Sequence, residues 1–80
     1  MSWETKISRT VRVMNSQHLG TFARLLTAIA SAGGNIGGIE LLNETSTQVV
    51  RDITIFADDE AGLEWILEVI RKNRGNAPLS

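Results

Sequence analysis

Three stretches with the apolar pattern of β-strands and two stretches with the periodicity of amphipathic helices share a chain of only 80 residues. The strand pattern is clearest where Ile53 and Ile55 alternate with Asp52 and Thr54. The predicted order is strand 9–14, helix 22–32, strand 35–43, strand 48–57 and helix 60–74. This order limits the chain to one small α+β domain.

The predicted order matches the ferredoxin-like arrangement βαββαβ except for its last strand. In that arrangement two helices cover one face of an antiparallel sheet. Residues 76–80 are too few and too polar for a full strand, so we predict a last strand that is short or missing. The domain is expected over residues 9–75, with terminal tails at 1–8 and 76–80.

A missing strand would leave the edge of strand 9–14 and part of helix 60–74 uncovered. At about 25 cal/mol per Å², leaving roughly a few hundred Å² of apolar surface in water costs several kcal/mol, a large share of the stability of a small domain. We therefore expect a partner surface at that edge or on that helix. A second copy of the chain, a swapped tail or the rest of a longer protein would each supply it.

Composition excludes several classes of partner. Eight Lys and Arg against nine Asp and Glu leave a formal charge of −1, without the basic excess that binds nucleic acid or anionic membranes. RNA recognition on this topology also needs exposed aromatic side chains, and the predicted strands contain only Phe56. The chain has no cysteine and no apolar run of the roughly 20 residues that a membrane helix needs. We expect a cytoplasmic protein without nucleic-acid or membrane partners.

The sequence contains no recognisable catalytic constellation. His18 is the only histidine, and no serine or carboxylate near it forms a familiar pair, so a solvated loop position is favoured. The acidic run from Asp58 to Glu60 directly precedes a helical stripe, which favours helix capping over metal binding. Acylphosphatase-like catalysis would need an arginine in loop 15–20, which contains none. We predict no catalytic residues, no metal and no cofactor.

A glycine-rich segment joins the first helix to the second strand. Nucleotide-binding glycine loops join a strand to a helix, so the order of elements excludes that role here. Gly33 and Gly34 are expected to end the helix. Gly37 and Gly38 are expected to mark a bulge or a close neighbour. Packing alone and the close approach of a small ligand are both compatible with these glycines.

The charged residues of the predicted strands are interpreted as a solvated sheet face. Arg51 and Asp52 point to opposite faces of their strand. Arg12 and Glu40, on the neighbouring strands, can join them in exposed pairs worth roughly 0.2–1 kcal/mol each. Trp65 is expected at an interface or at the margin of the core.

Three segments resemble those of ACT domains, which are small regulatory modules with the ferredoxin-like arrangement. They are residues 20–26 (GTFARLL), 28–36 (AIASAGGNI) and 49–55 (VVRDITI). The last segment, with the acidic run that follows it, is similar to the ACT segment at the N-terminus of some bacterial NAD-dependent malic enzymes, or malate oxidoreductases. The resemblance covers about residues 9–73.

The resemblance implies a non-catalytic regulatory domain that forms a homo-oligomer and binds an amino acid or another small effector. The domain would be attached to, or partnered with, a metabolic enzyme of the malate oxidoreductase type. The implied ligand contacts are Asn15 and Gln17 in the first loop and Asn35 on the second strand, with a tight approach to the first helix at Gly20. Leu19 stands where the family usually has proline, and Gln17 where Asn or Asp is commoner. A ligand-free domain that only pairs subunits is therefore the alternative.

Overall fold

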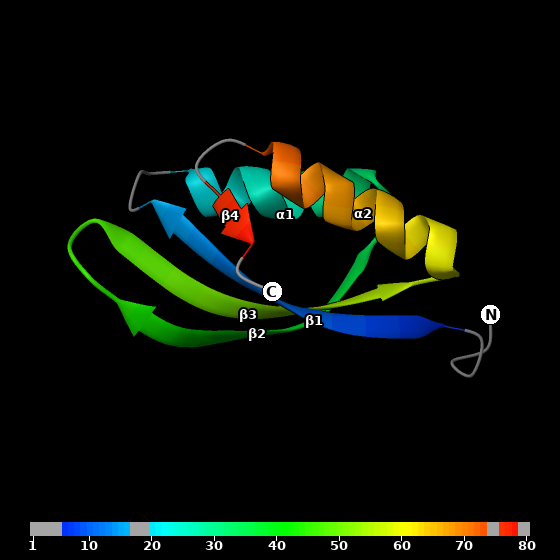
Figure 1. The fold of residues 1–80 in the computed structure, drawn as a ribbon, viewed down its shortest axis with the longest axis horizontal. Coiled ribbons are helices and arrows are strands. Elements are labelled where there is room, and N and C mark those ends of the chain that lie inside the picture. The colour runs from blue at the N-terminus through cyan, green and yellow to red at the C-terminus, as the bar shows by residue number, and fades with distance from the viewer. Residues whose placement is uncertain (1–5, 17–19, 74–75, 79–80) are drawn as a thin grey trace.

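The computed structural model describes residues 6–16, 20–73 and 76–78, and it shows two helices on one face of a four-stranded antiparallel sheet (Figure 1). The elements are β1 (Ile7–Ser16), α1 (Thr21–Ser31), β2 (Asn35–Glu44), β3 (Gln48–Ala57), α2 (Glu60–Lys72) and β4 (Asn76–Pro78). The strands lie side by side in the order β2-β3-β1-β4. The predicted ferredoxin-like fold is confirmed.

The last strand is short. β4 has three residues, which pair with Val13 to Asn15 of β1. The prediction of a short or missing last strand is therefore confirmed: the strand is present and short. It lies within residues 76–80, the segment that was predicted to be a C-terminal tail. β1 is longer than predicted, because it pairs with β3 over all ten of its residues. As a result, β4 covers only one end of the free edge of β1.

The hydrophobic core lies between the sheet and the two helices. Successive side chains of a strand point to opposite faces, and the odd-numbered residues of β3, such as Ile53 and Ile55, are buried on the helix side. The buried core consists of Val11, Val13, Leu25, Ile29, Ile53, Ile55, Ala57, Leu63, Ile66, Leu67 and Ile70. The buried residues of α2 are Leu63, Ile66, Leu67 and Ile70. Their helical spacing in the sequence predicted this apolar stripe.

Glycines end α1, as predicted. Gly33 has φ of +94°, in the left-handed region that glycine adopts without steric cost. The Gly34 N–H donates to the carbonyl oxygen of Ile29 at 3.0 Å, which satisfies a carbonyl at the helix end. A Cβ at Gly34 would lie 2.8 Å from Ile29 Cγ2 and 3.1 Å from Ile66 Cδ1. The junction between α1 and β2 is therefore packed too tightly for a side chain at this position.

The acidic run before α2 caps the helix, as predicted. Asp59 is the N-cap residue, and its Oδ1 accepts a hydrogen bond from the Gly62 N–H at 2.7 Å. The first turn contains an acidic residue and the last turn two basic residues, so the charges at both ends oppose the helix dipole. Gly75, predicted to stop this helix, lies outside the described residues. None of the helices in the described ranges is long and apolar enough to cross a membrane.

β2 departs twice from regular pairing with β3. The register shifts after Ile36 and again after Leu41, so that β2 holds an extra residue at each place. At the first shift, the ring of Phe56 lies so close to Gly37 that no Cβ fits between them. The bulge and the close neighbour predicted for this glycine pair are both present.

Candidate functional site

The end of β1 brings a buried polar side chain to the start of α1. Asn15 is only 1% exposed, and Arg51 Nη1 donates a hydrogen bond to its Oδ1 at 3.2 Å. The other half of the amide, Nδ2, has no hydrogen-bond partner among the residues that the structure describes. Leaving a buried donor unpaired costs about 1–3 kcal/mol. This unpaired donor marks the β1–α1 junction as a candidate binding site.

Arg51 lies beside the first turn of α1. Its guanidinium carbon is 4.0 Å from the centre of the Phe22 ring, which is a cation–π contact. Arg51 has the same parity on β3 as the buried Ile53, so its side chain is half-buried on the helix side of the sheet. The interpretation of Arg51 as part of the solvated sheet face is therefore wrong. The alternation of apolar residues along β3 indicated this orientation, since position 51 has the same parity as the inward-facing Ile53 and Ile55.

The N-terminus of α1 has no side-chain cap. Gly20, predicted at the tight approach to this helix, is its N-cap residue and has φ of +84°. The first turn carries no acidic residue, so no carboxylate of this turn offsets the positive end of the helix dipole. Thr21 is buried, and its Oγ1 lies 3.5 Å from Ser16 Oγ and 3.5 Å from Arg24 Nη2. The junction thus combines two arginines, a helix N-terminus and a buried amide.

Within one chain, Asn35 lies far from Asn15, which is at the end of β1 next to the N-cap Gly20 of α1. Asn15 lies opposite Val49, and Asn35 lies opposite Phe56, seven positions further along β3. At about 3.3 Å per residue, the two asparagines are about 23 Å apart along the sheet. A site that contains both of them would have to combine residues from two chains. Gln17 lies outside the described residues.

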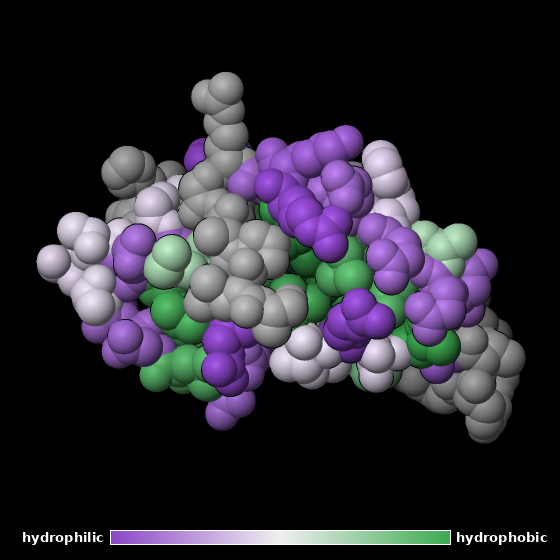
Figure 2. All heavy atoms as spheres, in the orientation of Figure 1, coloured by the Kyte–Doolittle hydropathy of each residue, from purple (hydrophilic) through white to green (hydrophobic). Residues whose placement is uncertain are grey.

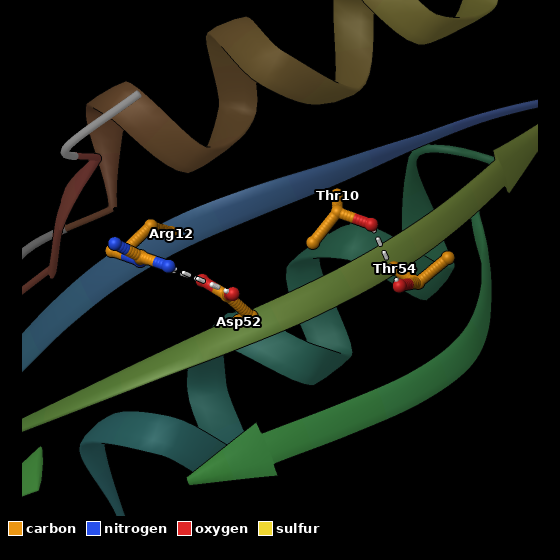
Figure 3. A network of polar contacts seen from close by, with 4 residues as sticks. All are labelled: Thr10, Arg12, Asp52 and Thr54. Atoms are coloured by element: carbon orange, nitrogen blue, oxygen red, sulfur yellow. Dashed lines mark hydrogen bonds and ion pairs between the residues drawn. The ribbon is translucent and has the colours of Figure 1, made fainter. Parts of the chain in front are cut away.

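The face of the sheet opposite the helices carries a polar network between β1 and β3 (Figure 3). Arg12 Nε and Nη2 donate to the two carboxylate oxygens of Asp52 at 2.9 and 3.2 Å. The hydroxyls of Thr10 and Thr54 lie 2.9 Å apart. Hydrogen bonding to Arg12 lowers the pKa of Asp52, and the same contact raises the pKa of Arg12, with further attraction from Glu40. The predicted cross-strand pair between Arg12 and Asp52 is confirmed.

β2 is an edge strand that exposes apolar side chains. Ile39 is 47% exposed, Leu41 57% and Leu42 40%. Figure 2 shows hydrophobic side chains at the surface at the lower left, in the region where Figure 1 draws β2 and β3. Sequence analysis did not identify this edge, because the apolar pattern of a strand does not tell whether the strand is central or outermost. An edge of this kind is suited to pairing with another chain.

A shallow groove of about 270 Å³ lies between α1 and α2. It is lined by Ala28, Ser31 and Ala32 of α1 and by Trp65 and Val69 of α2. Trp65 is 55% exposed, so the helix layer has an apolar surface of its own. Trp65 and the β2 edge are therefore rival places for a partner to bind.

The acidic residues of the predicted cap make structural contacts. Lys6 Nζ donates to Asp58 Oδ1 at 2.8 Å, and Asp59 caps α2. In the described part of the chain, no group of three or more histidine, cysteine, aspartate and glutamate side chains could hold a metal ion. His18 lies outside that part.

Comparison with solved structures defines the class of fold. The chain is similar to the crystal structure of the ACT domain from GTP pyrophosphokinase of Chlorobium tepidum, with a TM-score of 0.73 and 20% identity over 94% of this chain and 100% of that one. It is also similar to the solution NMR structure of that ACT domain, with a TM-score of 0.67 and 22% identity over 95% of this chain and 89% of that one. The fold is that of an ACT domain.

A curated relative narrows the resemblance to one kind of protein. The chain is 35% identical over 66 residues to the NAD-dependent malic enzyme of Geobacillus stearothermophilus. The match covers 82% of this chain but only 14% of the length of that enzyme. No protein-family model matches the chain. The chain therefore has the ACT fold and resembles one segment of a malic enzyme, as the sequence predicted.

Proposed function

We propose that the chain is a non-catalytic regulatory ACT domain that pairs subunits and binds a small effector. The observation that carries the pairing is the edge of β2, where apolar side chains are exposed on a strand that has a neighbouring strand on one side only. A two-fold axis would place the same edge of two copies side by side, so that apolar side chains of one copy meet those of the other. A second copy of this chain is therefore the partner that the edge fits.

The apolar surface of β2 is large enough to favour pairing. Complete burial of a leucine or isoleucine side chain contributes about 1.5–3 kcal/mol, so burial of the exposed half contributes about 1 kcal/mol. Ile39, Leu41 and Leu42 from two copies would together contribute about 6 kcal/mol. Strand-to-strand hydrogen bonds add to this, while association itself costs about 4 kcal/mol or more. We therefore expect a dimer whose population depends on protein concentration.

The pairing is tested by measuring molar mass with light scattering at several protein concentrations. The wild-type chain should approach twice its 8.8 kDa as the concentration rises. Leu41→Glu should remain monomeric, because the charge would be buried between the two edges. Trp65→Glu is the matched control, since Trp65 is 55% exposed and Leu41 57%. A monomeric Trp65→Glu with a dimeric Leu41→Glu would move the interface to the helices and refute pairing through β2.

The effector function rests on the β1–α1 junction. The buried Asn15 has an unpaired Nδ2, and the helix that starts next to it lacks a side-chain cap. Because Asn35 lies at the other end of the sheet, a site that uses both asparagines would form only between two chains. Calorimetry with amino acids and dicarboxylates tests this function. The alternative, a ligand-free dimerisation domain, predicts no heat of binding and no shift in melting temperature.

The parent activity that the relative suggests is oxidation of malate with NAD. We propose that this chain is the regulatory segment of such an enzyme, because its match to the malic enzyme covers most of the ACT fold. Deleting residues 9–75 from an enzyme that carries them should leave the turnover number intact and remove the response to effector. An enzyme that keeps its response after this deletion would rule out the assignment.

A further inference from the structure

One exposed apolar side chain plays no part in the function proposed above. Among the described residues, four large hydrophobic side chains are exposed: three belong to β2, and the fourth is Trp65 of α2, at 55%. Trp65 lines the groove between α1 and α2, together with Ala28, Ser31 and Ala32 of α1 and Val69 of α2. Of these lining residues only Ser31 is hydrophilic, so the helix layer presents a mainly apolar groove beside an exposed indole ring.

The size and chemistry of the groove fit one side chain better than a metabolite. Its volume of about 270 Å³ is below the roughly 300–1,000 Å³ of pockets that bind small molecules. Such pockets also hold several polar groups that orient the ligand, whereas this groove has little beyond the Ser31 hydroxyl. A second aromatic ring packs favourably against an exposed indole. The groove therefore fits an aromatic side chain carried by a short peptide segment.

The first five residues of the chain have the pattern of such a segment. In residues 1–5, Met1 and Trp3 alternate with a serine and a glutamate. Successive side chains of an extended segment point to opposite sides, so Met1 and Trp3 would face the same apolar surface. Trp3 is one of only two tryptophans in the chain, and the other is Trp65. Residues 1–5 lie outside the described residues and join them at Lys6.

The position of Lys6 brings the groove within reach of this segment. Its Nζ donates to Asp58 Oδ1 at 2.8 Å, and its side chain is only 14% exposed, so Lys6 is held beside the N-terminus of α2. Trp3 precedes Lys6 by three residues, which span about 10 Å when extended. Trp65 follows the N-cap Asp59 by six residues, or about 9 Å along the helix axis. The lengths therefore allow the two tryptophans of one chain to meet.

We propose that residues 1–5 lie across the groove between α1 and α2, with the Trp3 ring packed against Trp65 of the same chain. The contact covers apolar surface on both rings, and the ion pair between Lys6 and Asp58 anchors the segment. Among the described residues, β2 is then the one element whose large apolar side chains remain exposed. The N-terminal segment thus closes the helix layer as a docking surface and directs association with a second copy to β2.

The first experiment measures the accessibility of Trp3. Trp65→Phe leaves Trp3 as the only tryptophan and keeps an aromatic ring in the groove. Acrylamide should quench Trp3 at least about twofold less in this folded variant than in the same variant unfolded in urea, because the groove covers one face of the ring. In NMR spectra of the wild-type chain, the Trp3 indole should show contacts with the methyl groups of Ala28 and Ala32. Equal quenching in both states, or the absence of these contacts, would overturn the proposal.

The second experiment uses matched substitutions at one protein concentration. Trp3→Ser should lower the melting temperature by roughly 4–8 °C, because the packing of an aromatic ring is lost. Glu4→Ser, at the next position, should change it by less than about 2 °C. Ala28→Glu places a charge in the groove, so it should raise the quenching of Trp3 in the Trp65→Phe background. Ala30→Glu, at an exposed position of α1 outside the groove, is its control. Equal effects within either pair would refute the contact.

Protein concentration identifies which chain supplies the segment. Protection of Trp3 in samples that light scattering shows to be monomeric supports a contact within one chain, and it does so even if the chain never pairs. Protection that appears only as the molar mass doubles would assign the groove to a second copy and refute the proposal. Trp3→Ser should form assemblies larger than a dimer at high concentration, since Trp65 becomes a second docking surface. A molar mass equal to that of the wild-type chain would refute the directing role.

Discussion

Replacing Gly34 with alanine tests whether the junction between α1 and β2 is limited by space. The new Cβ would lie 2.8 Å from Ile29 Cγ2, 3.1 Å from Ile66 Cδ1 and 3.2 Å from the Ile29 carbonyl oxygen. Cβ atoms essentially never approach a neighbour closer than 3.0 Å, so the Ile29 side chain or the backbone around it must shift. Adding one methyl group to a packed core costs about 1–3 kcal/mol. We expect a loss of about 2 kcal/mol in the free energy of unfolding, or about 10 °C in melting temperature.

Two other glycines serve as controls for this substitution. A Cβ at Gly38 would meet nothing within 4 Å and its φ is not positive, so Gly38→Ala should be neutral or stabilise by up to about 1 kcal/mol. Gly33 also has open space but a φ of +94°, so Gly33→Ala should cost about 1–2 kcal/mol through backbone strain alone. The three substitutions separate steric crowding from backbone conformation.

Urea unfolding followed by circular dichroism measures these differences. All variants must be compared at one protein concentration, because the proposed pairing would make the apparent stability depend on concentration. Ile66→Val removes Cδ1, so it should recover part of the loss when it is combined with Gly34→Ala. If Gly34→Ala is as stable as Gly38→Ala, the tight packing of this junction does not hold in solution and the reasoning is refuted.

Three further predictions concern the cap, the core and the open face of the sheet. Asp59→Ala removes the N-cap of α2 and should lower the free energy of unfolding by about 0.5–2 kcal/mol in urea, whereas Asp59→Asn keeps an acceptor and should be close to neutral. Leu25→Ala empties a fully buried site and should cost about 2–5 kcal/mol, whereas Leu42→Ala, at 40% exposure, should cost clearly less in the same assay. Arg12→Gln should raise the pKa of Asp52 toward its ordinary value, because the hydrogen bonds that lower it are lost. In the wild-type chain, the stability from this ion pair is present above the ordinary pKa of Asp52 and is lost as the pH falls through the lowered pKa. NMR titration of the carboxyl carbon measures the shift, and an unchanged pKa would show that the pair does not form in solution.

The sequence predicted the elements best where local chemistry determines them. β3 occupies residues 48–57 as predicted, since its alternation is unbroken, and the ends of α1 and the start of α2 follow from glycines and an aspartate cap. β1 was predicted too short. Its ends are polar or irregular, and they become strand because they pair with β3: Ile7 pairs with Ala57, 50 positions away in the chain, and Ser16 with Gln48, 32 positions away. A local pattern does not contain such a contact.

The candidate site was predicted only in part, for the same reason. The family resemblance indicated Asn15, but the contact of Asn15 with Arg51 joins residues 36 positions apart. The alternation of residues along β3 could have placed Arg51 on the helix side of the sheet. It could not have identified Asn15 as the residue that Arg51 contacts. The exposure of β2 was missed because Ile39 and Leu41 have the apolar pattern of a buried strand, although the predicted ferredoxin-like order already places this strand at the edge of the sheet.

The two bulges of β2 restrict how its edge can be used. Long, flat, apolar edges are templates for the open-ended stacking of chains into fibres. The ten residues of β2, Asn35 to Glu44, lie opposite only eight residues of β3, Val49 to Phe56. Each of the two extra residues bends and twists β2. An edge that is bent and twisted in this way is a poor template for the regular, open-ended addition of strands.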